Sequence, residues 1–162
     1  MDRTQFERAL QDAVQGWIGV AFLHNGRTRS QGVDCLGLIV CLLREAGLPM
    51  LDGDGQTYAP DWYLHTPEDR YLDGVLARGA PVRREALLPG DVLYFRAGLL
   101  TRGQSPAVTH GGVFLGDDQF IHALNGRNVS LGDLRHKAWT TTYAGAVRPH
   151  ALLQLLGEEA PA

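Results

Sequence analysis

Cysteine is scarce in this sequence, with only Cys35 and Cys41 among 162 residues. Two thiols six positions apart are too few for a disulfide framework, and they lack the paired spacing of a zinc ribbon. We therefore expect reduced thiols and no bound metal.

Long apolar runs and an excess of basic residues are also absent. The longest apolar run, residues 38–43, is far shorter than the roughly 20 residues that span a bilayer, so no membrane span is expected. Residues 1–5 do not begin a secretory signal, which predicts synthesis in the cytoplasm without a signal peptide. Lys and Arg number 15 against 18 Asp and Glu, a balance that argues against nucleic acid as the main partner.

The overall composition is that of a globular domain. Apolar residues make up 44% of the chain and charged residues 20%, which is ordinary for a packed soluble fold. A chain of this length suits one domain. We expect a single domain over residues 1–157, followed by a loose C-terminal tail over residues 158–162.

Two N-terminal helices are predicted from apolar periodicity and capping residues. Residues 5–16 carry apolar side chains at helical spacing behind a capping box that begins at Thr4. Residues 35–46 are apolar nearly all round, with Asp34 as N-cap and Gly47 as the stop, so this second helix belongs to the core. Between the two, residues 24–33 are predicted to form a loop.

After an irregular segment over residues 51–65, a surface helix is predicted from Thr66 to Gly79. From Leu88 the periodicity becomes that of strands. The predicted strands cover residues 91–95, 110–115, 119–124, 128–131 and 143–148. Helices followed by strands predict an α+β fold, in which the 35–46 helix packs on a C-terminal antiparallel sheet.

Cys35 occupies the first position of its predicted helix, directly after Asp34. Unpaired backbone N–H groups and the helix dipole favour a thiolate at this position. A buried structural cysteine is the alternative, and Cys41 keeps that interpretation because it points to another side of the same helix.

Two histidines lie on neighbouring predicted strands that form a hairpin. If residues 116–118 form a three-residue loop, Gly112 lies opposite His122, and His110 shares a face with His122. A two-residue loop would place the histidines on opposite faces. Histidines that share a face can orient one another, so the register decides whether they form a pair.

A thiol at a helix start, an imidazole and a polar orienting group are the working set of cysteine nucleophilic catalysis. Cys35 is the predicted nucleophile and His110 the predicted base, held as an ion pair with the thiolate. His122 would fix the tautomer of His110. The backbone N–H of Cys35 is the predicted oxyanion donor.

At these residues the chain resembles the NlpC-type cell-wall peptidases, a family of papain-like cysteine hydrolases. The matching segments are GVDCLGL at 32–38, LPGDV at 88–92, HGGVFLG at 110–116 and FIHA at 120–123. The resemblance implies a papain-like fold, the same three catalytic residues, no cofactor, and hydrolysis of peptidoglycan stem peptides. The implied bond commonly lies between a D-γ-glutamyl residue and a diamino acid.

The segment around Tyr58, Asp61 and Trp62 is similar to the phage and prophage branch of that family. This implies phage tail proteins as possible partners and a virion tail acting on the host cell wall as the location. In the family a tyrosine often precedes the nucleophile, whereas Phe22 stands at the corresponding position here and lacks the hydroxyl.

Five residues near the predicted nucleophile and base are candidates for binding substrate. These are Phe22, His24, Asp34, Trp62 and Gly111. A solvated loop charge is the alternative for His24, and ordinary packing is the alternative for Trp62.

Three other functions stay open. The domain could be a structural component of a phage tail that uses the fold as an interaction module. Cys35, His110 and His122 could bind zinc with an open fourth position. A related papain-like domain could transfer acyl groups on lipids, although no apolar anchor is visible.

Overall fold

The computed structural model describes residues 1–50, 70–96 and 107–158. The helices are α1 (Arg3–Trp17), α2 (Cys35–Glu45), α4 (Arg70–Leu76), the 3-10 turn η1 (Arg84–Ala86), α5 (Lys137–Thr142) and α6 (His150–Leu156). The strands are β1 (Arg27–Thr28), β2 (Gly32–Val33), β3 (Gly79–Val82), β4 (Val92–Phe95), β5 (His110–Gly116), β6 (Gln119–His122), β7 (Ser130–Asp133) and β8 (Tyr143–Pro149).

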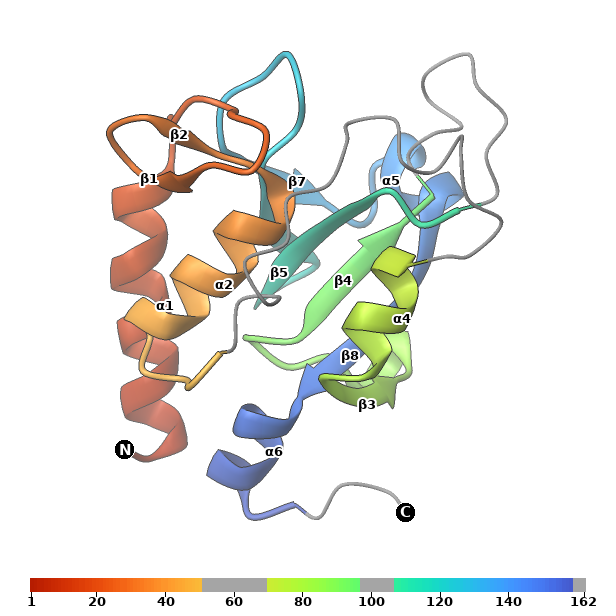
Figure 1. Ribbon diagram of the computed structural model, residues 1–162. Helices are drawn as coiled ribbons and strands as arrows, with labels where there is room; N and C mark the ends of the chain where they lie inside the picture. The colour runs from red at the N-terminus through yellow and green to blue at the C-terminus, as the bar shows by residue number, and fades with distance from the viewer. Residues whose placement is uncertain (51–69, 97–106, 159–162) are drawn as a thin grey trace.

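Six of these strands form one antiparallel sheet in the order β3-β8-β4-β5-β6-β7. Figure 1 shows α1 and α2 side by side, with α2 running across β5. The sequence prediction of an α+β fold, with the Cys35 helix on a C-terminal antiparallel sheet, is confirmed. No helix in the described ranges combines the length and apolarity needed to cross a membrane.

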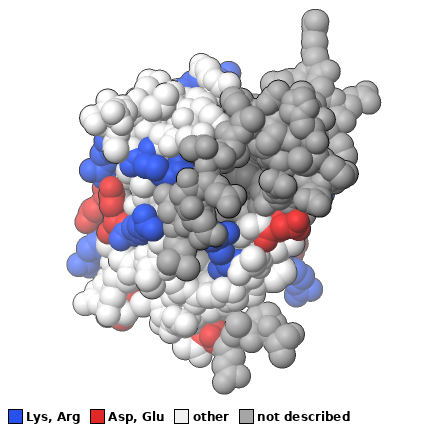
Figure 2. Space-filling model, in the orientation of Figure 1, with Lys and Arg blue, Asp and Glu red and all other residues white. Residues whose placement is uncertain are grey.

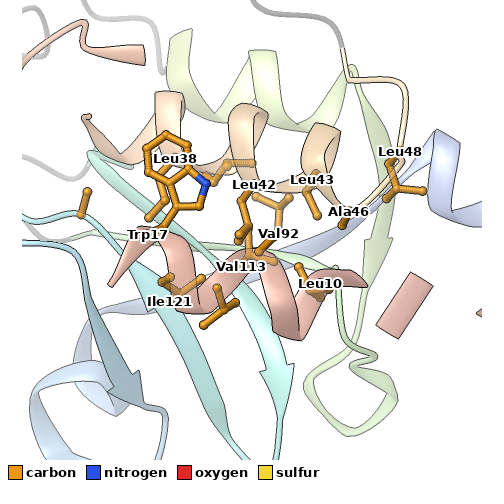
Figure 3. Packing of buried hydrophobic residues seen from close by; sticks show 14 of the residues in the cluster. Leu10, Trp17, Leu38, Leu42, Leu43, Ala46, Leu48, Val92, Val113 and Ile121 are labelled. Carbon is orange, nitrogen blue, oxygen red and sulfur yellow. The ribbon is translucent and has the colours of Figure 1, made fainter. Parts of the chain in front are cut away.

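The sheet carries a hydrophobic core on each face because its side chains alternate with a period of two. On β4, Val92 packs into the larger core with α1 and α2, whereas Leu93 and Phe95 point into a smaller core on the other face. Figure 3 shows Val113 and Ile121 of the sheet meeting leucines of the two helices in the larger core. The smaller core is aromatic and includes Trp139 of α5 and Tyr143 of β8.

Helix α1 begins earlier than predicted. Asp2 is the N-cap: its carboxylate accepts from Gln5 N, and the Gln5 side chain accepts from Asp2 N. This reciprocal capping box places Thr4 inside the first turn, so the prediction of a box led by Thr4 is wrong. The sequence pattern fits both candidates, since Gln5 follows Asp2 and Glu7 follows Thr4 at the same spacing, and in the structure Glu7 pairs with Arg3 instead.

The β5-β6 hairpin differs from the predicted three-residue loop. Gly116 pairs with Gln119, so the turn contains two residues, Asp117 and Asp118, and both have positive φ. A register shift between Phe114 and Gly116 then adds one residue to β5. Because this bulge offsets the shorter turn, Gly112 still pairs with His122, as predicted.

Several short elements were not predicted. The 24–33 segment contains the β1-β2 hairpin rather than only a loop, and Gly79, predicted to close a helix, begins β3. Helices α5 and α6 were also missed. Residues 51–69, which hold the predicted irregular segment and the cap at Thr66, lie outside the described residues.

On the face drawn in Figure 2, basic and acidic side chains alternate in small groups. Ion pairs among the described residues include Arg29 with Glu45 and Arg3 with Glu7. Such mixing leaves no large field of one sign among the described residues of this face.

Candidate active site

Helix α2 begins at Cys35 because Asp34 supplies a strong N-cap. One carboxylate oxygen of Asp34 accepts from Gly37 N at 2.7 Å, and the other accepts from Asn25 N at 2.7 Å. The Arg27 guanidinium lies 3.1 Å from the same carboxylate. Asp34 is almost fully buried, so these contacts tie the loop before the helix to its first turn.

Gly37 lets that loop approach the helix closely. A Cβ at Gly37 would overlap the carbonyl oxygen of Gly26 and lie 2.6 Å from the Arg27 side chain. The chain therefore needs glycine two positions after Cys35. The result is a fixed backbone around the start of α2.

His110 and His122 form the other part of the site. The Nε2 atom of His110 lies 3.1 Å from the Nδ1 atom of His122, and their rings are nearly perpendicular. Both side chains are buried, with 3% and 4% of their surfaces exposed. The predicted sharing of one face is therefore confirmed by direct contact.

The strand register brings the two rings together. Gly112 lies between them on the same face, opposite His122. A Cβ at Gly112 would lie 2.7 Å from the Ile121 carbonyl oxygen and 3.3 Å from the Cβ of His122. Absence of a side chain here lets the diagonal His110 reach its partner.

Aromatic rings surround the histidine pair. Phe95 lies 5.8 Å from His110 and Phe120 lies 5.1 Å from His122, measured between ring centroids. Trp139 contacts both imidazoles, at 5.7 Å from His110 and 4.8 Å from His122. The pair is thus a polar contact inside an apolar shell.

This shell disfavours a charged imidazole. Burial, with a smaller effect of His122, lowers the pKa of His110 to about 3. Burial and then the nearby Arg127 lower the pKa of His122 to about 4. Both rings are therefore neutral at pH 7, which requires one nitrogen of the contact to donate and the other to accept.

Cys35 belongs to a different element. It is 8% exposed at the start of α2, and α2 packs on β5 and β6, the two strands that carry the histidines. In the described part of the chain, no group of three or more His, Cys, Asp or Glu is arranged to hold a metal ion. The zinc interpretation therefore gains no support from this arrangement.

The predicted substrate-binding residues come from separate segments of the chain. Phe22 is half-buried against the larger core and bridges to Val33, while His24 lies in the following loop. Gly111 is buried in β5 opposite Tyr94. Trp62 lies outside the described residues. The binding roles of these residues and of Asp34 stay predictions.

Asp91 ends the turn before β4, and its side-chain contacts are structural. Its carboxylate accepts from Leu88 N at 2.8 Å and from Arg148 Nε at 2.9 Å. Asp91 is fully buried directly before β4, whereas Phe95, whose ring contacts His110, is the last residue of that strand. The pair with Arg148 joins β4 to β8.

The amino-acid sequence matches a known protein family. Residues 19–148 match the NlpC/P60 family. The chain belongs to the NlpC/P60 family. Members of that family are cysteine-type peptidases, and the relatives of this domain include endopeptidases.

Individual relatives of this NlpC/P60 domain are distant. It is 27% identical over 139 residues to the probable endopeptidase NlpC of Escherichia coli, covering 86% of this chain and 75% of that protein. It is 28% identical over 136 residues to the gamma-DL-glutamyl hydrolase of Bacillus subtilis, covering 83% of this chain and 27% of that protein. The chain thus spans about a quarter of the Bacillus protein.

Solved structures confirm the fold of the NlpC/P60 domain. A lipoprotein-like NLP/P60 protein of Staphylococcus aureus superposes with a TM-score of 0.63 at 22% identity. The match covers 92% of this chain and 42% of that protein. At this identity the likeness shows the fold alone.

The sequence did not single out Trp139, which contacts both histidines. The residue lies in a stretch, 135–142, that has no strand or helix periodicity strong enough to predict α5. Its role depends on how a six-residue helix docks on the sheet, which no local pattern indicates.

Proposed function

We propose that this NlpC/P60 domain is a cysteine peptidase that hydrolyses peptidoglycan stem peptides at the bond between a D-γ-glutamyl residue and the following diamino acid. The observation that carries the proposal is the buried His110–His122 contact on the strands against which the Cys35 helix packs. The name of the Bacillus relative, a gamma-DL-glutamyl hydrolase, supports the choice of bond.

The hydrogen-bond direction follows from the chemistry required of His110. To accept a proton from Cys35 through Nδ1, neutral His110 must carry its hydrogen on Nε2 and donate it to Nδ1 of His122. His122 must then be protonated on Nε2. One hydrogen bond thus sets both tautomers.

The reaction proceeds through an acyl-enzyme. The Cys35 sulfur attacks the scissile carbonyl carbon while the thiol proton passes to His110, and the backbone N–H of Cys35 stabilises the oxyanion. His110 gives that proton to the leaving amine as the C–N bond breaks. Water, deprotonated by His110, then attacks the thioester, and the proton returns to the released thiol.

Burial changes one detail of the sequence interpretation. A thiolate–imidazolium pair at rest requires a charged His110, whereas burial lowers the pKa of this histidine to about 3. We therefore propose a neutral thiol and imidazole at rest, with proton transfer during attack.

Digestion of purified stem peptides, followed by mass spectrometry, tests the proposal. The expected product pair separates after the D-γ-glutamyl residue, and Cys35→Ala abolishes its formation while Cys41→Ala retains it. Intact peptides after incubation with the wild-type domain would contradict the proposal. Products cut elsewhere in the stem would contradict the chosen bond.

We further propose that the domain is associated with a phage tail and acts on the host cell wall. The support is the sequence similarity around Trp62 to the phage branch. Mass spectrometry of purified virions tests it, since the protein should be recovered with tail proteins. A purely structural role in the tail predicts that particles carrying Cys35→Ala assemble and infect normally. A role in cell entry predicts that these particles assemble but infect poorly.

A further inference from the structure

Trp139 has contacts that the proposed reaction does not use. Its ring lies nearly parallel to His110, at 26°, and presents an edge to His122, at 78°. It also packs edge-on against Phe95 and Phe120, with centroids 5.1 and 5.2 Å away. One side chain therefore contacts both rings of the pair and both aromatic residues beneath them.

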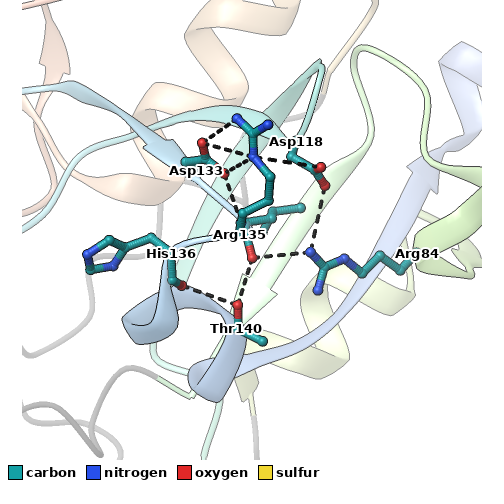
Figure 4. Close-up of polar contacts among 7 residues, drawn as sticks. Arg84, Asp118, Asp133, Arg135, His136 and Thr140 are labelled. Atoms are coloured by element: carbon teal, nitrogen blue, oxygen red, sulfur yellow. Dashed lines mark hydrogen bonds and ion pairs between the residues drawn. The ribbon is translucent and has the colours of Figure 1, made fainter.

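Helix α5, which carries Trp139, is held by several tertiary contacts. Thr140 Oγ1 donates to the Leu134 carbonyl at 2.8 Å, and the same carbonyl accepts from Arg84 at 3.1 Å. Arg84 also lies 3.6 Å from Asp118, a residue of the β5-β6 turn. Figure 4 shows this network converging on the chain just before α5. A helix of six residues needs such anchors, since short helices are unstable alone.

These contacts of α5 hold the half-buried Trp139 ring against the buried contact between His110 and His122. The contact between His110 and His122 has correct geometry only while both rings keep their tilt. Free rotation of either imidazole would break the contact, because a single nitrogen on each ring takes part. An adjacent flat ring restricts that rotation and excludes water from the same volume.

We propose that Trp139 is a positioning residue for the histidine pair, holding the two imidazoles in their hydrogen-bonding orientation and keeping water from the bond between them. This inference rests on the proposed function, because it assigns the tryptophan a purpose in the same site. It does not require Trp139 to touch the substrate.

The elements around the pair carry other groups that titrate or bear charge. These are Cys35 on α2, Arg127 after β6, His136 and Lys137 around the start of α5, and Tyr143 beside Trp139. All of them are kept in the variants proposed below. A change in the titration of His110 or His122 therefore reports the loss of the indole.

The test replaces the ring by side chains without one, in Trp139→Leu and Trp139→Met, and restores a ring in Trp139→Phe. Histidine titrations are followed through the imidazole nitrogens by NMR, which needs no hydrolytic activity. Loss of the indole admits water, so both histidines should titrate about one pH unit higher or more. Trp139→Phe should recover most of that change.

Trp17→Leu is the matched control, because Trp17 is buried in the larger core and has no contact with the histidines. It should lower thermal stability and leave the histidine titrations unchanged. In peptide hydrolysis, Trp139→Leu should reduce kcat roughly tenfold with KM within about twofold, as expected for a misaligned catalytic group.

A purely structural Trp139 would give a different result. Both ringless variants would then melt earlier but would keep the wild-type histidine titrations and the wild-type pH profile of kcat, and that outcome would overturn the proposal. If the domain cleaves no peptide at all, the proposed function fails, while the NMR titration still decides the positioning role.

Discussion

The Nε2 atom of His110 lies 3.1 Å from the Nδ1 atom of His122, and this contact is enclosed by aromatic side chains. The arrangement separates two properties that are often found together in cysteine hydrolases, an oriented base and a charged base. In the proposed mechanism the second histidine orients His110, and burial, which lowers the pKa of His110 to about 3, keeps the proposed base neutral at pH 7.

The acceptor role of His122 is tested by isosteric replacement. In His122→Asn the amide oxygen takes the place of Nδ1, so kcat should stay within about tenfold of the wild-type value. His122→Leu has no acceptor and should lose about 10²- to 10⁴-fold, the usual contribution of acid–base catalysis. Steady-state hydrolysis of a stem peptide measures both. Equal loss in the two variants would show that His122 does not act through its Nδ1 atom.

Acid should destabilise the protein through the same histidines. Their folded pKa values, about 3 and about 4, lie below the ordinary value of 6.5, so the unfolded chain binds more protons between these limits. Stability is complete above about pH 6.5 and falls as the pH drops towards 4. The loss between pH 7.5 and pH 5 should be about 2 to 4 kcal/mol, measured by urea unfolding.

His110→Gln removes one of these groups and should flatten that pH dependence. His150→Gln is the control, since His150 is exposed at the start of α6. It should leave the slope between pH 7.5 and pH 5 as in the wild type. A slope unaffected by His110→Gln would mean that other groups cause the acid sensitivity.

Removal of the Asp34 carboxylate should destabilise the domain more than removal of an ordinary cap. Asp34→Ala loses a helix cap and removes the carboxylate that accepts from the part-buried donors of Asn25 and Arg27, so a cost of about 2 to 4 kcal/mol is expected. Asp2→Ala, at the exposed cap of α1, should cost about 1 kcal/mol. Urea unfolding compares the two, and similar costs would contradict the buried role of Asp34.

The Asp91–Arg148 pair should show strong coupling. Burial raises the pKa of Asp91 although Arg148 donates to its carboxylate, so the ion pair only partly offsets the desolvation of this group. Replacing one partner leaves the other buried and should cost about 3 to 5 kcal/mol. The double variant Asp91→Leu with Arg148→Met should cost less than the sum of the two single variants.

The exposed pair of Arg3 and Glu7 on α1 is the control for that cycle, with a coupling of about 0.3 to 0.5 kcal/mol. Thermal or urea unfolding of the four proteins in each cycle gives the coupling energies. Additive losses at Asp91 and Arg148 would show that the two side chains act independently.

The sequence predicted the parts of the site that depend on local signals. Asp34 followed by an apolar run and Gly47 is enough to locate the Cys35 helix, and alternation with the hairpin pattern is enough to put His110 and His122 on one face. What it missed depends on distant partners. Strand β3 forms because it pairs with β8, about 70 residues later. Helix α5 is stabilised by the hydrogen bonds that Arg84 and Thr140 donate to the Leu134 carbonyl, just before the helix.

Register was predicted correctly at one end of the hairpin and incorrectly at the other. The sequence has a glycine and two aspartates between the predicted strands, but it does not indicate whether Gly116 belongs to the loop or to the strand. The positive φ angles of Asp117 and Asp118 assign those two residues to the turn. Leu115 then becomes the extra residue of β5.

Because of that extra residue, the number of residues between His110 and His122 decides whether the two side chains share a face. Homologous or engineered chains that add or delete one residue between His110 and His122 would turn one imidazole towards the opposite core, unless the bulge at Leu115 is gained or lost at the same time. Changes of two residues preserve the contact. The distance along the chain between the two histidines can therefore vary among functional relatives only in even steps, or in odd steps matched by a change at the bulge.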